Sequence, residues 1–459
     1  GIRLPSCRKV AGHLGISRNT VISAYQNLIV DGLVISRAKS GYFVDDNSRK
    51  SSFGQLAAAD NSASKPAPGL FEKISPTHYP SRYRNTERPY NWLEYKYPFV
   101  CNQMDAGRFP LTDWRRCSNE ALGRAHAPHI FSDHLYEDCE ELLTQVRTRL
   151  LPRRGIVAEP DQILLTAGAQ QAIYITSVLL GGPTRTIGAE NPCYQDARNI
   201  FDQQFGNVRP IPVDLEGIVV SRELADCDLV YTTPNHQFPT TVRMSKQRRT
   251  QLLSFARENN VVIIEDDYDS ETDFDPLIVP ALCSAPDGAS IVYVGSLSKS
   301  LSPGLRIGYL VGPADFIREA RALRGMMIRH LPPLIQLTAA HYIRLGHYDA
   351  LVSRFQSAFE NRWHVARAAL AKSFPDADIT SGWGGTNFFI TAPIGVDLTG
   401  LTTAARMQGV VIDPTRACYR NPDDGRDKLR LGVSAIKAEK ITEGIAVVRS
   451  IYDRIVSGN

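Results

Sequence analysis

Lys299 has the surroundings of a lysine that reacts with an aldehyde. It follows the apolar segment 291–294, which is typical of a buried strand. A second apolar segment, 261–264, ends in carboxylates, Asp266 among them, and in the phenol of Tyr268. A lysine amine forms a Schiff base with an aldehyde, and an aspartate can keep a pyridine nitrogen protonated so that the ring withdraws electrons. These residue types at strand ends therefore predict a pyridoxal phosphate (PLP) site.

Each of these residues alone has an ordinary alternative. A lysine after a strand is usually a surface lysine, and Asp266 could cap a helix or form an ion pair. A third feature favours the cofactor: the small-residue turn 166–170 follows the strand-like segment 162–165 and opens an apolar helix. Such a turn presents free backbone N–H groups and the positive end of the helix dipole to a phosphate. Many helices begin this way, so it is the combination that predicts PLP binding.

The first 45 residues predict a helix, a tight turn and a second helix. Gly15 suits the turn and Ser17 suits the N-cap of the second helix. Asp31 and Gly32 end that helix, and 33–44 then predicts a β-hairpin. The apolar residues at helical spacing are Val10, Leu14, Ile16, Val21, Ala24, Tyr25, Leu28 and Ile29.

Positive charge is concentrated in this N-terminal part. Residues 1–50 hold eight Lys or Arg and three Asp, a net charge of +5. The whole chain has a net charge of +4, so the remainder has −1. Contacts with DNA phosphates require such an excess. An ordinary helical hairpin with a solvated basic face is the alternative.

Length and composition indicate more than one domain. A chain of 459 residues is too long for one core, and 43% hydrophobic and 22% charged residues are ordinary values. No apolar run is long enough for a membrane span, and no signal peptide is apparent. The eight cysteines lack metal-ligand spacing, so we expect no metal site and free thiols in a reducing cytoplasm.

We predict three parts: a DNA-binding domain over residues 1–45, a linker over 46–90, and a PLP-binding domain over 91–459. The linker is rich in Ser, Ala, Asn and Lys and poor in large apolar residues. In the third part, helical and strand patterns alternate, which predicts an α/β doubly wound sheet with ligands at the carboxyl ends of its strands. We expect strands near 162–166, 185–189, 208–213, 228–232, 261–265, 290–294 and 306–311. A long helix from about 350 and strands near 386–391 and 428–433 suggest a smaller C-terminal α+β domain.

The runs 231–240 and 265–271 carry a family resemblance. From about residue 100 to 459 the chain resembles the fold-type I aminotransferases, in the version found in MocR-type regulators. These are GntR-family transcription factors, in which a winged helix-turn-helix domain is fused to an aminotransferase-like domain. Residues 1–45 resemble that winged helix-turn-helix. The resemblance implies a homodimer that binds double-stranded DNA.

The resemblance also implies cofactor roles. Lys299 is expected to form the internal aldimine, Asp266 to meet the pyridine nitrogen and Tyr268 to meet the ring hydroxyl. The residues expected to hold the phosphate are Ala169, Gln170, Ser296, Ser298 and Arg306.

Further positions of the pocket are matched to the family. Tyr194 is expected to stack on the ring, although it could be a core aromatic. Asn235 or His236 is expected to contact the ring oxygen. Arg430 matches the arginine that takes a substrate carboxylate, a task that suits its bidentate guanidinium, although it could form an ordinary salt bridge. Thr241 departs from the family's frequent glycine, and the loop at Tyr136 looks shortened.

Contacts with DNA follow from the winged-helix resemblance. The second helix is expected to enter the major groove by its first residues, where arginine can read guanine and asparagine adenine. The expected groove contacts are Arg18, Asn19 and Thr20, with Arg8 and Ser17 near phosphates and Lys39, Ser40 and Gly41 at the tip of the wing. GntR domains usually have another helix before residues 4–6, so we expect a further segment before Gly1.

The expected function is a transcription regulator and not an enzyme. A primary-amine effector would displace Lys299 from the cofactor, form an external aldimine and change DNA affinity. The segment 94–115 resembles regulators of ectoine or taurine catabolism, which would make the effector a diamino acid derivative or an amino sulfonate. Two alternatives stay open: an active aminotransferase, and a PLP sensor that regulates vitamin B6 synthesis.

Overall fold

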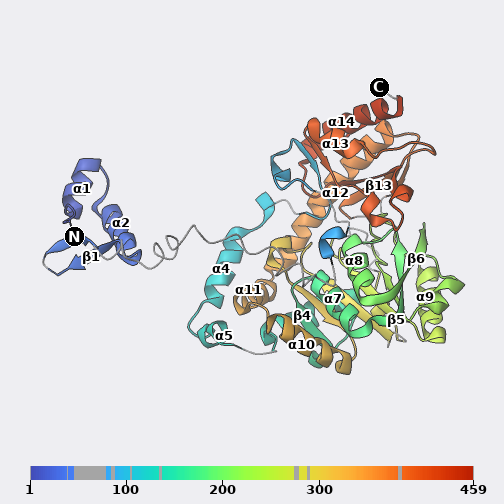
Figure 1. Ribbon diagram of the computed structural model, residues 1–459, viewed down its shortest axis with the longest axis horizontal. Helices are drawn as coiled ribbons and strands as arrows, with labels where there is room; N and C mark the ends of the chain where they lie inside the picture. The colour runs from blue at the N-terminus through green and yellow to red at the C-terminus, as the bar shows by residue number, and fades with distance from the viewer. Residues whose placement is uncertain are drawn as a thin grey trace, which may run out of the picture. The chain divides into compact units, whose positions relative to one another are not determined.

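The computed structural model describes residues 2–38, 40–45, 79–83, 88–103, 106–133, 137–272, 279–286, 290–380 and 385–457. The chain forms two compact units, Gly1–Tyr79 and Pro80–Asn459 (Figure 1). No helix in the described ranges is long and apolar enough to cross a membrane.

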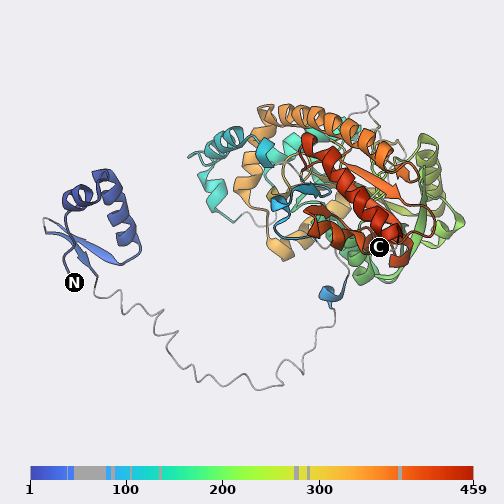
Figure 2. The ribbon, with the colours of Figure 1, turned by 90° about the horizontal axis from the view of Figure 1, so that it is seen from above.

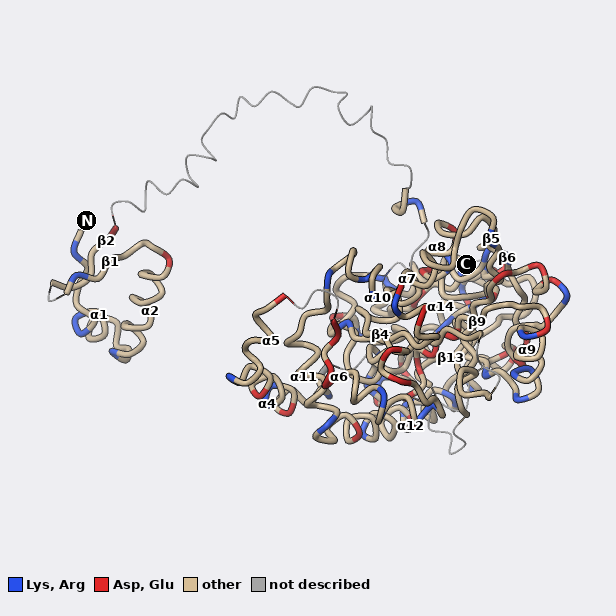
Figure 3. The backbone as a smooth tube through the Cα atoms, turned by 90° about the horizontal axis from the view of Figure 1, so that it is seen from below, with Lys and Arg blue, Asp and Glu red and all other residues tan. Residues whose placement is uncertain are grey.

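The N-terminal unit contains the predicted helix, turn, helix and hairpin. Helix α1 (Cys7–Leu14) ends at Gly15, whose φ of 65° is left-handed, and α2 (Arg18–Val30) begins at Ser17, whose side chain accepts from the backbone N–H of Thr20. Strands β1 (Val34–Arg37) and β2 (Gly41–Val44) pair antiparallel. Basic positions, blue in Figure 3, predominate over acidic ones along this unit. The winged helix-turn-helix prediction is confirmed as a fold.

An eight-stranded sheet organises the second unit. Its order is β4-β11-β10-β9-β8-β5-β6-β7. Strands β5, β6, β8, β9 and β10 are parallel, β11 is antiparallel to both of its neighbours, and β7 is antiparallel to β6. All seven predicted strands are present, whereas the two-residue β7 was not predicted. The bounds are β4 Ile163–Thr166, β5 Gly182–Asn191, β6 Phe205–Asp214, β7 Gly217–Ile218, β8 Leu229–Thr232, β9 Val262–Asp267, β10 Ile291–Ser296 and β11 Gly308–Val311.

Helices cover both faces of this sheet. On one face, α7 (Ala169–Leu180), α8 (Gln195–Gln204) and α10 (Ala314–Ile328) pack on strand residues such as Ile264. On the other, α9 (Lys246–Asn259) packs on residues such as Ile263, and α6 (Glu140–Gln145) and α11 (Pro333–Arg344) pack on residues such as Tyr293. Neighbouring strand residues thus face opposite layers, as the two-residue period of a strand requires. Helices α4 (Leu111–Ala121) and α5 (Ala127–Phe131) lie next to α11.

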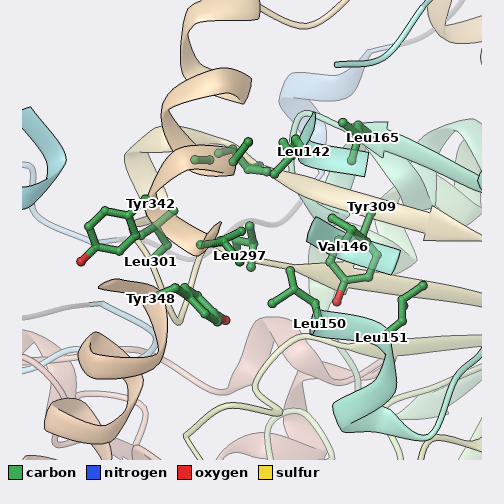
Figure 4. Close-up of a cluster of buried hydrophobic side chains, with 14 of the residues drawn as sticks. Leu142, Val146, Leu150, Leu151, Leu165, Leu297, Leu301, Tyr309, Tyr342 and Tyr348 are labelled. Carbon is green, nitrogen blue, oxygen red and sulfur yellow. The ribbon is translucent and has the colours of Figure 1, made fainter. Parts of the chain in front are cut away.

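The turn that carries Lys299 is anchored in the hydrophobic core. Leu297 and Leu301 are both buried, two residues before and after the lysine. Figure 4 shows them in one cluster with Tyr342 and Tyr348. The hydroxyl of Tyr348 donates to Ser300 Oγ at 2.8 Å. This packing fixes the backbone of Lys299, whose side chain is not part of the cluster.

A smaller C-terminal part has its own core. Helix α12 (His347–Ser373) packs beside α14 (Ala438–Ser457), the red helix of Figure 2. The antiparallel strands β12 (Asp378–Thr380), β13 (Asn387–Thr391) and β15 (Lys428–Gly432) form one sheet. Strand β14 (Val410–Ile412), which follows α13 (Leu401–Met407), pairs in parallel with β3 (Tyr97–Phe99). The predicted long helix and the two predicted strands are confirmed.

Candidate cofactor and effector site

The carboxyl ends of five strands meet at one edge of the large sheet. Strands β4, β5, β8, β9 and β10 all run in the same direction, so the segments that follow them lie together. The antiparallel β11 begins at this edge, which brings Arg306 beside the others. Ligands of open α/β sheets bind at such edges.

A cavity of about 100 Å³ lies at this edge. Nine of the residues predicted to bind the cofactor line it, together with Asn102 and Phe238, which were not predicted. The nine are Ala169, Gln170, Tyr194, Asp266, Tyr268, Ser296, Ser298, Lys299 and Arg306.

The amine of Lys299 is poised for nucleophilic chemistry. Its Nζ donates to the carbonyl oxygen of Asn102 at 3.2 Å. Burial lowers the pKa of Lys299 to about 8, against a smaller upward effect of Asp269, and Arg430 lowers it further. Since only the neutral amine attacks an aldehyde, this lowered pKa favours Schiff-base formation near neutral pH.

Asp266 presents one unsatisfied carboxylate oxygen to the cavity. The side chain is buried, with 4% of the residue exposed. Its Oδ2 accepts from the hydroxyl of Tyr231 at 2.7 Å, whereas its Oδ1 has no partner among the described residues. Burial raises the pKa of Asp266 to about 7, although the bond from Tyr231 opposes this. A buried acid with a free oxygen fits a protonated ring nitrogen, which would supply the missing donor and charge.

The opposite side of the cavity suits a phosphate. Gly168 precedes α7 with φ 83° and ψ 170°, a conformation open to glycine alone, and no side chain caps the first N–H groups of the helix, which lack helical partners. Its absent Cβ leaves room for Arg306, whose Nη2 would lie 2.8 Å from such an atom. The Oγ of Ser298 is buried and has no partner in the described chain. These donors fit an anion with several oxygens.

Aromatic rings form the side walls of the cavity. Tyr194 and Phe238 meet edge to face with 5.5 Å between ring centroids, and Phe238 lies 6.0 Å from Tyr268. The hydroxyl of Tyr194 donates to Asp196 at 2.9 Å. Burial raises the pKa of Tyr268, so its phenol stays a hydrogen-bond donor.

Asn235 and His236 are not among the residues that line this cavity. The amide of Asn235 donates to Asp267 at 2.6 Å and accepts from Arg249 at 2.7 Å, so it belongs to a buried network behind the site. The ring of His236 lies beside Gly385, and its Nε2 has no partner among the described residues.

A larger cavity of about 580 Å³ continues from the first and contains Arg430. The two cavities share Asn102, Gln170, Tyr194, Phe238 and Lys299. Arg430 is buried, and its guanidinium carbon lies 4.2 Å from the centre of the Phe238 ring. Its Nε and Nη2 atoms have no partner among the described residues. The salt-bridge alternative for Arg430 is therefore absent from the described contacts, and a ligand with an acid group fits better.

The candidate DNA contacts lie on the N-terminal unit. Arg8, Arg18, Asn19 and Thr20 are exposed. Ser17 is also exposed, and its hydroxyl oxygen caps the helix by accepting from the backbone N–H of Thr20 at 3.1 Å. In the wing, the backbone N–H of Ser40 donates to Arg37, and Gly41 has a φ of 105°. Lys39 and Tyr136 lie outside the described residues.

Comparison with known proteins gives the family. The model of aminotransferases of class I and II matches residues 100–448, and the model of bacterial regulatory proteins of the gntR family matches residues 1–44. The chain belongs to the MocR-type regulators. It is 36% identical over 450 residues to the HTH-type transcriptional regulator TauR of Rhodobacter capsulatus, covering 97% of this chain and 91% of that protein. It is 27% identical over 462 residues to the probable rhizopine catabolism regulatory protein MocR of Rhizobium meliloti, covering 98% and 89%.

A solved structure supports the fold of this MocR-type chain. The multiple substrate aminotransferase of Thermococcus profundus superposes with a TM-score of 0.76 at 22% identity, covering 85% of this chain and all of that one (100%). The C-terminal unit therefore has a fold-type I aminotransferase fold, which implies dependence on PLP. The Oδ1 of Asp266 and the Oγ of Ser298, which have no partner among the described residues, and the glycine at 168 all fit that cofactor.

Sequence reasoning missed several residues of the site. Tyr231, which bonds to Asp266, ends a predicted strand, and pairing of β8 with β9 could have suggested it. Asn102 has a left-handed φ of 58° and had no signal in the sequence. Arg88 and Asp413, which line the larger cavity, come from segments far apart in the chain.

Proposed function

We propose that this protein regulates transcription in response to a small primary amine that reacts at Lys299. The cofactor supplies an aldehyde carbon and an electron-withdrawing ring. Lys299 would hold the cofactor through its amine, and the amine of an effector would take the place of the lysine. Asp266 would pair with the protonated ring nitrogen. The turn at Gly168 with Ala169 and Gln170, and the side chains of Ser296, Ser298 and Arg306, would hold the phosphate.

The observation that carries the proposal is the continuity of the two cavities. Lys299 lines both cavities, and the larger one is also lined by Arg430, whose Nε and Nη2 have no partner among the described residues. An effector with an amine at one end and an acid group at the other fits this arrangement. Similarity to TauR and to regulators named after catabolic pathways favours an amino sulfonate such as taurine over a diamino acid derivative.

DNA binding is assigned to the N-terminal unit. We propose that Arg18, Asn19 and Thr20 read base edges in the major groove and that Arg8, Ser17 and the wing at Lys39, Ser40 and Gly41 contact phosphates. The protein acts as a homodimer on double-stranded DNA. An effector changes DNA affinity only through its different affinity for the DNA-binding and the released arrangement of the domains.

Visible absorption spectroscopy tests this proposal. We expect the purified protein with PLP to show a Schiff-base band that the Lys299→Ala variant lacks. Taurine should shift the band in the wild type without continuous formation of a keto product. A band that taurine and other small amines leave unchanged would argue against amine sensing.

Two other outcomes identify the alternatives. Steady conversion of the amine with a keto-acid acceptor would show an aminotransferase, a function that the retained Lys299 and Asp266 leave chemically feasible. A change of DNA affinity on adding PLP alone, without any amine, would show a PLP sensor.

A further inference from the structure

The segment that leads into the aminotransferase-like domain forms part of the effector cavity. Pro80 and Tyr83, at a short 3-10 helix (Pro80–Arg82), line the 580 Å³ cavity, as does Arg88. These residues lie at the end of the predicted linker between the two domains. A ligand in this cavity is therefore next to the chain that connects it to the DNA-binding unit.

Arg88 is held there by a buried carboxylate. Its Nε donates to Asp413 Oδ1 at 2.9 Å, and its Nη2 donates to Asp413 Oδ2 and to the carbonyl oxygen of Cys101 at 3.0 Å. Asp413 also accepts from the backbone N–H of Cys101 at 2.8 Å. Its carboxylate is 8% exposed, and its backbone forms a bridge with Arg430. Asp413 thus pairs with Arg88 through its side chain and neighbours Arg430 along the backbone.

Both arginines have donors left for a ligand. Arg430 has no described partner at Nε or Nη2, the two positions that form a bidentate pair with an anion. Arg88 uses Nε and Nη2 for its own bonds, so among the described residues its Nη1 group makes no hydrogen bond. Asp413 forms an ion pair with Arg88, whereas Arg430 forms none among the described residues, so the site favours an anionic group.

We propose that Arg430 and Arg88 together bind the three oxygens of a sulfonate, and that the sulfonate thereby fastens the linker end to the effector domain. Two oxygens pair with Arg430, and the third accepts from Arg88. A carboxylate has only two oxygens, which lie in one plane. It can therefore pair with Arg430 but offers no third oxygen to Arg88, which stays bonded to Asp413. This inference rests on the proposed function, since it names the acid group and the regulatory contact of the same site.

The first test uses sulfate, which offers the same three-oxygen face without an amine. Binding of sulfate and of acetate to the full-length PLP-loaded protein is measured by titration calorimetry at constant ionic strength. We expect Arg88→Gln to weaken sulfate binding at least tenfold and to leave acetate within twofold. Arg88→Lys keeps the positive charge but not the planar guanidinium with its several N–H donors, and it should also lose the preference for sulfate. Equal sulfate binding by the wild type and both variants would refute the joint binding of an anion by Arg88 and Arg430.

The second test compares taurine with β-alanine, which has the same amine and spacer but a carboxylate. We expect the wild type to respond to at least tenfold less taurine than β-alanine in the visible spectrum, and Arg88→Gln to lose this preference. The variant should also lose the taurine-dependent change in DNA affinity. The control is Arg82→Gln, an exposed arginine of the same segment that is not among the cavity residues.

The two tests separate the possible failures. If Arg88→Gln keeps the preference for taurine or the taurine-dependent change in DNA affinity, the joint binding of the sulfonate by Arg88 and Arg430 is refuted, although amine sensing stands. If neither amine changes the spectrum of the wild type, amine sensing fails, and the sulfate titration alone decides whether the two arginines form an anion site. An unchanged Schiff-base band and a cooperative unfolding transition above the assay temperature show that the variants are folded and loaded.

Discussion

Replacement of Asp266 by Asn should remove a pH dependence from the stability of the cofactor-free protein and weaken cofactor binding. In the cofactor-free fold, burial raises the pKa of Asp266 from the ordinary 3.8 to about 7. The folded state therefore binds more protons than the unfolded state between these values, and stability falls as pH rises through this window. At about 1.4 kcal/mol per tenfold change in proton affinity, the loss is about 4 kcal/mol in total and about 3 kcal/mol between pH 5 and pH 8.

Asparagine removes this loss because it does not ionise. Its amide oxygen can still accept from Tyr231, but its buried NH2 group lacks a partner, which costs about 1–3 kcal/mol at every pH. The free energy of unfolding of the variant relative to the wild type should thus increase by about 3 kcal/mol from pH 5 to pH 8. The PLP-loaded protein behaves oppositely, since loss of a charge-assisted bond of about 1.5–3 kcal/mol weakens PLP binding by about 10- to 150-fold.

Urea unfolding of the cofactor-free proteins at pH 5 and pH 8 measures the first effect, and PLP titration measures the second. Asp315→Asn, at a side chain that is 87% exposed, controls for the change of charge. Comparison with this control isolates Asp266 from the other buried acids. A stability difference between Asp266→Asn and wild type that stays constant with pH would refute the raised pKa and with it the burial argument.

Three further predictions follow from single contacts. Asp138→Asn should destabilise the fold by about 3–5 kcal/mol in urea unfolding, because it breaks the ion pairs of this buried carboxylate with Arg324 and Arg321; a change under 1 kcal/mol would contradict this. The rate of Schiff-base formation between Lys299 and added PLP should rise about tenfold per pH unit up to about pH 8 and then level off in stopped-flow absorbance, whereas a continued rise to pH 10 would indicate an ordinary lysine. Gly168→Ala should weaken PLP binding at least tenfold in titration, since its Cβ would meet Arg306 at 2.8 Å, and unchanged affinity would place the phosphate elsewhere.

The regular elements could be predicted because local patterns determine them. Apolar runs gave each main strand of the sheet, and Ser17 and Gly15 marked the helix ends of the N-terminal unit. The end of β9 was misjudged: the prediction stopped at 265, whereas the strand continues to Asp267. The charged residues suggested a strand end, but buried partners from Tyr231, Arg154 and Asn235 let them stay in the sheet.

The site residues that follow strands could be predicted, whereas those contributed by segments distant in the sequence were missed. Lys299 and Asp266 end neighbouring strands, so their proximity follows from the parallel register of β9 and β10. Arg88 and Asp413 are 325 positions apart in the chain, and no local pattern joins them. Thr241 was noted because glycine is frequent there. Its φ of 64° explains the preference, and its hydroxyl donates to the carbonyl oxygen of Thr380 at 3.2 Å.

Hydrogen-bond partners distinguish Asp266 from the other buried acids at the strand ends. Both oxygens of Glu190 accept hydrogen bonds from neighbouring threonines and Gln237, and both oxygens of Glu265 accept backbone N–H groups. Asp267 is likewise satisfied, by Arg154 and by hydroxyl and amide groups. Asp266 alone among these four acids keeps an oxygen without a partner in the described chain. Since an unsatisfied buried carboxylate is unfavourable, the fold holds this oxygen ready for a donor that the protein itself does not supply.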